Sequence, residues 1–456
     1  MISQLNAVFL WSVLAYLTSV LLKYVLTDLF GNGIFVSDDV RWKKARQSTV
    51  SIFSKRSFQN IMEPSCHRTL DELIQHLHIA TETSQEVDLC QIFFKFTLES
   101  FVLMTFGKAL NLLNWEKKSE NNLSEIASAF VQAFDFVQEH LDFRVAMSSG
   151  WKIVETLNPV LRNKMISACQ VMNSFTYSLI EERQESFLNK NFSEKTDSPQ
   201  DLLGLFITFR DDLSRTELRD VTLNLLAAGR DTTGEALSWC FYHLIRNPDI
   251  MAQIREETYE ILGDEGDNRK PSDCILVFPR SDCALTITCK RINFKHDIIY
   301  VEKNIKFALR DDKIPGGPII KAGDGVRWSD WTMARDPEIW GEDCVEYRPR
   351  RWIDESGKIK QFGQWKFHAF SGGPRTCPGM NLATFEAVSV IVGLLENFDI
   401  KFFPGWLDKV PKVGSFGTNS PSYPIPKYRS SLTHPMAQPM LVSIKSRKQT
   451  MSKNIL

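Results

Sequence analysis

The feature that most constrains this chain is the ten-residue stretch Phe-Ser-Gly-Gly-Pro-Arg-Thr-Cys-Pro-Gly at positions 370–379. The glycines and the proline at 372–374 interrupt both helix and strand, so the backbone must turn there. The residues that follow, Met380 to Leu395, are apolar with helical character. Cys377 therefore lies in a turn that leads into a helix, where backbone N–H groups and the positive end of the helix dipole favour a thiolate.

Two further residues of this turn are suited to a bound anionic group. Arg375 places a positive charge two residues before Cys377 and can bind an acidic group through two parallel hydrogen bonds. Gly379 allows the backbone to pass close to a bulky neighbour. The alternative is that Cys377 is an ordinary buried cysteine, because free cysteine is among the most buried residue types.

The turn matches the pattern F-x-x-G-x-R-x-C-x-G at every fixed position, and in this it resembles the haem-binding loop of the cytochrome P450 superfamily. The resemblance implies that Cys377 is the axial thiolate ligand of the iron of haem b. It also implies that Arg375 pairs with a haem propionate, that Phe370 packs on the sulfur side, and that Gly373 and Gly379 are the glycines of the cofactor loop. A thiolate ligand favours O–O cleavage, which is the chemistry of oxygen insertion.

Composition excludes several other classes of protein. The chain has 456 residues, of which 43% are hydrophobic and 24% charged, an ordinary globular balance with a sizeable core. The net charge of -1 gives no indication of nucleic-acid binding. The nine cysteines are odd in number and show no C-x-x-C spacing, which argues against a disulfide framework and a zinc site and fits a reducing compartment.

The first residues, Met1 to Leu22, carry no charge and are long enough to cross a bilayer as a helix. Lys23 and the basic residues within 41–46 follow, so the bulk of the chain should face the cytosol. We expect residues 1–30 to be a single-pass membrane anchor and lead-in, and the resemblance implies the endoplasmic reticulum membrane. The alternatives are a cleaved signal peptide, although a basic n-region is lacking, and a buried core helix.

Trp42 and Arg46 lie four residues apart, on one face of a predicted helix. They resemble the W-x-x-x-R helix of the superfamily, whose tryptophan and arginine reach a haem propionate. The alternative is a basic surface helix with one packed tryptophan. Family members place a hinge, a small β-sheet and two helices between the anchor and this helix, whereas barely twenty residues separate Leu22 from Trp42 here. We therefore expect the amino-terminal β-region to be missing.

A long helix is predicted from Ser214 and Glu217, which have the spacing of a capping box, to about Arg246. Its middle contains Asp231 and Thr232, an acid and a hydroxyl at a place where the helix should lie in the core. Reducing dioxygen requires protons in an apolar pocket, and a carboxylate with a hydroxyl can relay them.

The same residues resemble the superfamily's oxygen-activation motif A/G-G-x-D/E-T-T, which implies a catalytic role for Asp231 and Thr232. The alternative is a polar turn exposed on the surface.

The stretch from about 273 to 301 is anomalous. It contains three of the nine cysteines and no glutamate, and the E-x-x-R sequence expected in the superfamily is absent between Asp231 and Cys377. We expect a wrong splice or a frame slip there. Arg351 aligns with the arginine that the missing glutamate would join, so we expect it to turn to solvent or to be an unpaired interior charge. An unpaired buried charge costs about 3–5 kcal/mol.

Together these features predict a mainly α chain with small β-sheets, the cytochrome P450 fold, with a haem-thiolate monooxygenase domain over 31–456 behind the transmembrane helix. The resemblance is strongest to the branch that hydroxylates fatty acids and alkanes. It implies insertion of one oxygen atom from O2 into a C–H bond of a fatty acid or another hydrophobic small molecule. The electrons would come from NADPH through a membrane-bound NADPH–haemoprotein reductase.

Two competing functions remain open at this point. The chain could be a degenerate, non-catalytic haem-thiolate protein, which the missing E-x-x-R favours and the intact Asp231, Thr232 and Cys377 oppose. It could also be a haem-thiolate isomerase that needs no reductase, although such an enzyme has little use for a proton-delivering acid and alcohol.

Overall fold

The computed structural model describes most of the chain between residues 25 and 447. The described ranges are 25–83, 86–113, 122–147, 150–189, 201–209, 213–262, 305–344, 346–356, 360, 362–413, 425–429 and 431–447. The predicted anchor Met1 to Leu22 and the anomalous stretch 273–301 lie outside these ranges.

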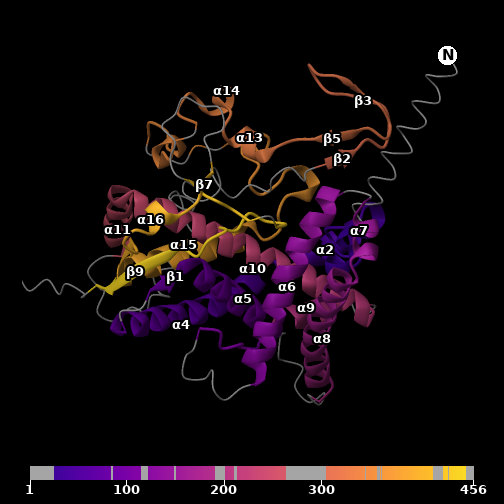
Figure 1. Cartoon of the computed structure of the whole chain (residues 1–456), viewed down its shortest axis with the longest axis horizontal. Coiled ribbons are helices and arrows are strands. Elements are labelled where there is room, and N and C mark those ends of the chain that lie inside the picture. The colour runs from indigo at the N-terminus through magenta and orange to yellow at the C-terminus, as the bar shows by residue number, and fades with distance from the viewer. Residues whose placement is uncertain are drawn as a thin grey trace, which may run out of the picture.

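Helices form most of the molecule, as the sequence predicts, and they make up the lower and central part of Figure 1. The helices of the main body are α2 (Asp39–Ile52), α3 (Lys55–Ser57), the π-helix Phe58–Met62, α4 (Glu63–Glu82), α5 (Leu89–Phe106), α6 (Asn122–Met147), α7 (Trp151–Leu157), α8 (Pro159–Asn189), α9 (Leu202–Phe209), α10 (Arg215–Arg246), α11 (Pro248–Leu262), α15 (Met380–Asn397) and α16 (Trp406–Lys409).

Helix α10 is the central helix, and its predicted bounds are confirmed. Ser214 caps the first turn in a capping box with Glu217, and the helix ends before Asn247. It continues without a break through Gly229, although glycine disfavours helix. The reason for the glycine is packing, because a Cβ at Gly229 would lie 2.1 Å from the ring of Phe101 on α5. The two helices thus approach closely where the predicted proton-delivery residues lie.

Helix α5 is almost wholly apolar and lies inside the molecule. It ends at Gly107, whose φ of 65° is left-handed, a conformation that glycine adopts readily at the end of a helix. Among the described residues it is also the one helix long and apolar enough to cross a membrane, and 83% of that apolar stretch is buried within the fold. Its hydrophobicity is therefore satisfied by packing against α4 and α10.

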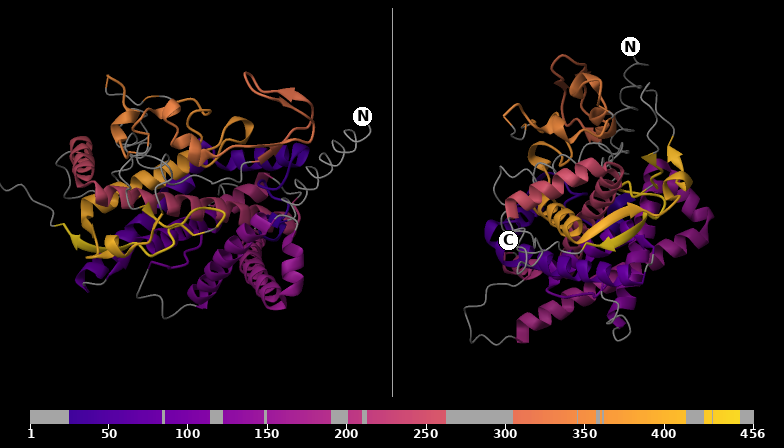
Figure 2. Two further views of the ribbon diagram at one scale, coloured as in Figure 1. Left: turned by 45° about the horizontal axis from the view of Figure 1, so that its top comes forward. Right: turned by 90° about the vertical axis from the view of Figure 1, so that its left-hand side faces the viewer.

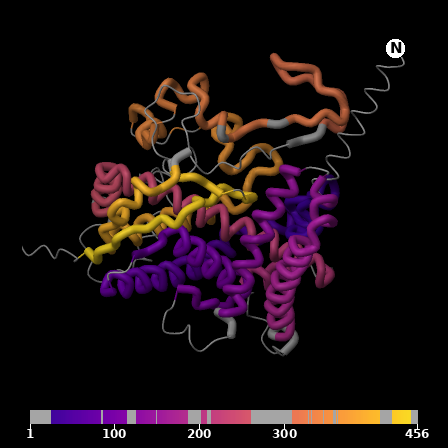
Figure 3. The backbone as a smooth tube through the Cα atoms, viewed as in Figure 1, coloured from indigo at the N-terminus to yellow at the C-terminus, as the bar shows by residue number. Residues whose placement is uncertain are grey.

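A three-stranded antiparallel sheet joins distant parts of the chain. Strand β9 (Leu441–Ser446) is central, between β1 (Val87–Asp88) and β6 (Phe398–Phe402). Val87 pairs with Val442, and Ile400 pairs with Ile444. Figure 3 shows the yellow end of the chain lying beside the purple segment of α4 and α5.

Smaller hairpins stand on the upper side of the helical body, and both views in Figure 2 show this orange segment rising from it. They comprise β2 (Ile305–Phe307) with β5 (Gly325–Arg327), and β3 (Asp312–Lys313) with β4 (Ile319–Ile320), followed by α13 (Asp330–Ala334), α14 (Pro337–Trp340) and the 3₁₀ turn Pro349–Trp352. A further pair joins β7 (Lys412–Val413) to β8 (Ile425–Pro426).

The expectation for Arg351 is wrong. Its guanidinium is neither unpaired nor turned to solvent, because it donates to Asp343 and to the backbone carbonyl of Trp340. The side chain is only 11% exposed. An acid from the same loop therefore takes the place of the absent glutamate, which the spacing of the superfamily motif could not reveal.

The lead-in between residues 25 and 36 is tied to the helical body. Asp28 accepts a hydrogen bond from Arg144 of α6 at 2.6 Å, and the backbone N–H of Asn32 donates to Asp220 of α10 at 2.8 Å. From 25 to 83 the described chain contains helices and turns but no strand. Residues 1–24 lie outside the described ranges, so the expectation of a missing amino-terminal β-region stays a prediction.

Candidate functional site

The loop around Cys377 is closed by backbone hydrogen bonds. The N–H of Cys377 donates to the carbonyl of Phe370 at 2.8 Å, and the N–H of Thr376 donates to Gly373 at 3.1 Å. Gly373 has a φ of 65°, a left-handed conformation that favours glycine. Helix α15 begins at Met380, with Gly379 as its N-cap. The prediction of a turn leading into a helix is confirmed.

The thiol of Cys377 is partly buried. Burial raises the pKa of Cys377 above its usual value, while a hydrogen bond from the Gly379 N–H and the charge of Arg46 act in the opposite direction. The predicted stabilisation of a thiolate by the turn therefore does not prevail in the protein alone. A coordinated metal cation withdraws the proton from a thiol, so a raised pKa is compatible with metal binding at such a site.

Three of the predicted cofactor-binding residues are brought together beside this loop. The guanidinium of Arg375 lies 4.6 Å from the ring centre of Trp42 on α2, and it donates to Asp38 at 2.8 Å. Arg46 follows one helical turn after Trp42 and acts on Cys377 by its charge. The sequence placed these residues on separate motifs, and the structure assembles them into one cluster with two positive charges.

The residues present fit a haem in their donor chemistry. Cys377 supplies a thiol that binds iron, and Arg46, Arg375 and the indole of Trp42 supply donors for two carboxylates. A Cβ at Gly379 would lie 3.8 Å from the ring of Phe53 and 3.9 Å from the sulfur of Cys377. Glycine therefore keeps the space beside the sulfur clear of a side chain.

Asp231 of α10 is a buried acid, so the alternative of an exposed polar turn is excluded. The carboxyl is 3% exposed and accepts from Gln138 Nε2 at 2.6 Å and from Arg230 at 2.9 Å. Burial raises the pKa of Asp231 to about 6, although the charge of Arg230 acts against this. The pKa of Asp231 thus lies nearer neutral than that of an ordinary aspartate, which is the direction that suits proton transfer.

Thr232 is held by its own helix. Its hydroxyl donates to the carbonyl of Ala228 at 2.6 Å. No direct hydrogen bond joins Thr232 and Asp231 in the described residues, so the acid and the alcohol are neighbours in sequence with separate partners. The hydroxyl oxygen of Thr232 keeps the capacity to accept a proton or hydrogen bond while it donates to the backbone.

Sequence reasoning missed the partners of Asp231. Gln138 lies on α6, 93 positions earlier, and no local pattern connects the two residues. Arg230 is adjacent to Asp231 and also bonds to Asp135 at 2.7 Å. The pairing of Arg230 with Asp231 could therefore have been predicted from the sequence, because the two residues are neighbours in the motif. The distant partner could have been found only from the fold.

Glu235 is a second buried acid on α10, one helical turn after Asp231. Its carboxyl accepts the backbone N–H of His434 at 2.9 and 3.0 Å, and burial raises the pKa of Glu235 to about 8. One turn further on, the indole N–H of Trp239 donates to the carbonyl of His434 at 3.1 Å. The segment 431–436 is thus attached to α10 through the backbone N–H and the backbone carbonyl of His434.

The two clusters belong to helices that pack together. The Cys377 loop opens α15, Asp231 and Thr232 lie on α10, and these two helices are in contact. His368, which precedes the loop, bonds to Asp330 at 2.9 Å and meets the ring of Trp328 edge-on.

A comparison with protein families finds one match that spans most of the chain. The cytochrome P450 family model matches residues 16–273 and 296–425. The gap between the two matched ranges falls inside the anomalous stretch 273–301. The match begins within the residues predicted as an anchor.

Curated relatives carry the same family name. The chain is 35% identical to cytochrome P450 monooxygenase cyp1 of Mycosarcoma maydis, over 91% of this chain and 63% of that protein. It is 28% identical to cytochrome P450 86B1 and 25% identical to alkane hydroxylase MAH1, both of Arabidopsis thaliana. These two alignments cover 83% and 85% of this chain and 68% and 75% of the relatives. The chain thus spans less than two thirds of the fungal relative's length.

A solved structure shares the fold. The heme domain of cytochrome P450DA superimposes with a TM-score of 0.67 at 21% sequence identity, covering 93% of this chain and 82% of that one. The mainly helical fold class predicted from the sequence is confirmed.

Proposed function

The chain belongs to the cytochrome P450 family, and on that basis we propose that it is a haem-dependent monooxygenase with Cys377 as the ligand of the iron. Proteins of this family bind haem b through a cysteine thiolate. The observation that carries the proposal is the cluster at the start of α15, where the Gly379 N–H and the charge of Arg46 act on the Cys377 thiol and Arg375, two residues before it, lies over the ring of Trp42.

The roles of the cofactor-binding residues follow from their chemistry. Cys377 would bind iron as a thiolate, and Arg46 with Trp42 would hold one propionate. Arg375 would hold a propionate through the N–H donors that now contact Asp38. The propionate would then replace the carboxylate of Asp38, which carries the same charge. Phe370 would pack on the sulfur side, and Gly373 and Gly379 would give the loop its shape.

The reaction consumes protons as well as electrons. In sum, a substrate C–H bond, O2, two electrons and two protons give a C–OH group and one water. The haem, when bound, supplies the activation of dioxygen. In this chain Asp231 would carry protons, since its carboxyl is buried and its pKa of about 6 lies near neutral, and the hydroxyl of Thr232 would pass them on.

We propose a fatty acid or a similar lipid as the substrate. The support is the resemblance to the branch that hydroxylates fatty acids and alkanes, together with a relative named as an alkane hydroxylase. The electrons would come from NADPH through a membrane-bound NADPH–haemoprotein reductase. Shifts in the haem absorption spectrum across a series of fatty acids of increasing length test this, and a series without any shift contradicts it.

We also propose that residues 1–30 comprise a membrane anchor, the run Met1–Leu22, and a lead-in, and that the anchor lies in the endoplasmic reticulum membrane with the domain over 31–456 in the cytosol. The support is the uncharged run Met1–Leu22 and the basic residues that follow it. Fluorescent tagging with selective permeabilisation tests both the membrane and the side. A tag on the carboxyl end that is protected from added protease in intact microsomes would contradict the orientation.

The absorption spectrum of the reduced, carbon-monoxide-bound protein tests the central proposal. A Soret band typical of thiolate-ligated haem in the full chain, with product formed in the presence of reductase, NADPH and O2, is the expected result. The competing function is a degenerate protein without catalysis, which the missing E-x-x-R favours. A protein with no haem, or a haem band without turnover of any lipid, would establish that alternative.

A further inference from the structure

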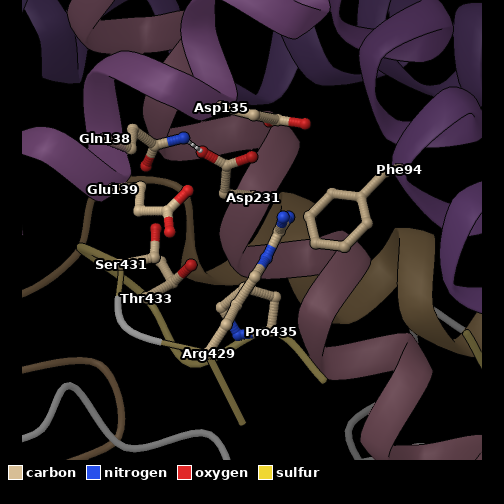
Figure 4. A pocket seen from close by; sticks show the side chains of 9 residues that line it. All are labelled: Phe94, Asp135, Gln138, Glu139, Asp231, Arg429, Ser431, Thr433 and Pro435. Carbon is tan, nitrogen blue, oxygen red and sulfur yellow. Dashed lines mark hydrogen bonds between the residues drawn. The ribbon is translucent and has the colours of Figure 1, made fainter. Parts of the chain in front are cut away.

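A small polar pocket lies beside Asp231, on the side of α10 that faces α6 and the carboxyl-terminal segment. Its volume is about 10 Å³, which is room for one water molecule. Figure 4 shows the side chains converging on it from these three elements and from α5. The lining residues are Phe94, Asp135, Gln138, Glu139, Asp231, Arg429, Ser431, Thr433 and Pro435.

The lining has the chemistry of a water site. A buried water needs two to four polar partners, and this pocket offers hydroxyls from Ser431 and Thr433, the Gln138 amide and the Asp231 carboxyl. Ser431 and Thr433 are buried, whereas Glu139 is exposed. The pocket therefore extends from the buried carboxyl of Asp231 towards a surface carboxylate.

The amide of Gln138 fixes the carboxyl of Asp231 at this pocket. Gln138 is only 4% exposed, and its Nε2 donates to Oδ2 of Asp231 at 2.6 Å. Oδ1 of Asp231 accepts from Arg230 instead. Each carboxyl oxygen thus has one donor, and the two donors hold the group on the side of α6. The hydrogen bond from Gln138 also lowers the pKa of Asp231 against the larger opposing effect of burial.

Charged and titratable groups lie near Asp231 on α6, on α10 and on the carboxyl-terminal segment. Asp135 raises its pKa, while Arg230 and Arg429 lower it. Among the described residues, those recorded in this region are Asp135 and Glu139 from α6, Arg230 and Glu235 from α10, and Arg429 from the carboxyl-terminal segment.

We propose that Asp231 takes up protons from solvent through one water held in this pocket, with Gln138 as the residue that positions its carboxyl there. This rests on the proposed function, in which Asp231 carries protons for oxygen reduction. One proton passes from solvent to the water and one from the water to the carboxylate, so the water is restored after each transfer. For each proton that Asp231 gives up one is taken in, and no electron moves.

The first test measures the titration of Asp231 itself and needs no turnover. Infrared difference spectra of the holoenzyme against pH follow the carboxyl C=O band, which Asp231→Asn assigns. Gln138→Leu removes the hydrogen bond at similar volume, so the titration should move up by about one pH unit. Gln138→Asn, which is one methylene shorter, should move it in the same direction and serves if the leucine variant fails to fold. Gln132→Leu, an exposed glutamine on the same helix, should leave the titration unchanged.

The second test fills the pocket. Ser431→Val replaces a hydroxyl with apolar bulk, which should exclude the water. We expect a several-fold fall in product formed per NADPH and a larger solvent deuterium isotope effect, with the haem spectrum unchanged. Gln138→Leu should show the same fall, and Gln132→Leu should not.

The results separate the two levels of the argument. A wild-type protein without a thiolate-ligated haem band overturns the proposed function. A normal haem band with an unshifted Asp231 titration in both Gln138 variants overturns the positioning role. A normal titration shift with unchanged coupling and isotope effect in Ser431→Val overturns the proton path through the pocket.

Discussion

Nη1 of Arg351 lies 2.9 Å from Oδ1 of Asp343, and the same guanidinium donates to the backbone carbonyl of Asp343. The two residues are eight positions apart in a loop above the helical body. Burial alone would raise the pKa of Asp343, but the hydrogen bonds and charges of Arg351 and Arg348 bring it below its usual value. Asp343 of the same loop therefore supplies a counter-charge for Arg351, which it shares with Arg348.

Removing this acid should destabilise the protein. For Asp343→Ala we expect the free energy of unfolding to fall by about 1–2 kcal/mol, because Arg351 is left with carbonyl partners alone. The difference should begin to shrink below the usual pKa of an aspartate, about 3.9, and should disappear only when the pH falls below the lowered pKa of Asp343 in the folded protein. Urea denaturation measures it. The control is Asp311→Ala, which breaks an exposed pair with Lys321 and should leave the stability almost unchanged. Equal losses in the two variants would contradict the argument.

Glu235 should make stability depend on pH in the opposite direction. Because burial raises its pKa from 4.5 to about 8 in the folded protein, folding favours the protonated acid, and stability falls as the pH rises between these values. Glu235→Gln cannot ionise, so it should match wild type near pH 5 and exceed it at pH 8 by about 2–4 kcal/mol. Thermal unfolding at a series of pH values measures the difference.

The matched control for this prediction is Glu185→Gln, an exposed glutamate on α8, which should follow wild type at every pH. Parallel pH curves for Glu235→Gln and wild type would show that Glu235 does not carry the dependence.

Gly229 is required by packing in this structure. A Cβ there would lie 2.1 Å from the buried ring of Phe101, so Gly229→Ala should destabilise by about 1–3 kcal/mol despite the better helix propensity of alanine. The double variant Gly229→Ala/Phe101→Leu should be less destabilised than the sum of the two single variants. Gly363→Ala, where no atom lies within 4 Å of the added Cβ, is the control. Urea denaturation measures the free energies of unfolding. If the losses in the two single variants simply add up in the double variant, this explanation is wrong.

Cys377 should be the one partly buried cysteine among those described whose loss removes the haem. Cys377→Ser is expected to abolish the thiolate-type band of the reduced carbon-monoxide complex and to lower the haem content per chain. Cys169→Ser, which replaces a partly buried cysteine on α8, should keep both. The pyridine haemochrome assay and the absorption spectrum give the two readouts. Retention of the band in Cys377→Ser would refute the ligand assignment.

What the sequence predicts correctly is local in origin. Ser214 and Glu217 are three residues apart, and the capping box between them needs no other part of the chain. Gly107 ends α5 because of its own backbone freedom. The loop before Cys377 is recognised from its spacing, and its backbone closes on itself through the Phe370 carbonyl.

What the sequence fails to predict depends on contacts between distant segments. The partner of Asp231 is Gln138 from another helix, and the reason for Gly229 is Phe101, more than a hundred residues earlier. The error over Arg351 has a different cause. The prediction assumed that Arg351 has no partner because the E-x-x-R motif is absent. Any carboxylate within reach can accept hydrogen bonds from a guanidinium, and here Asp343 does so.

The order of strands in the three-stranded sheet has a consequence for how the chain is made. Strand β9 lies between β1 and β6 but is synthesised after both. Neither β1 nor β6 can form its hydrogen bonds to β9 until the ribosome has passed residue 446. Domains generally fold as units during translation, and this unit can be completed only by its final segment. A premature stop codon before Leu441 would release a chain that lacks β9, so β1 and β6 would have no strand to pair with. We expect cellular proteases to degrade such a chain.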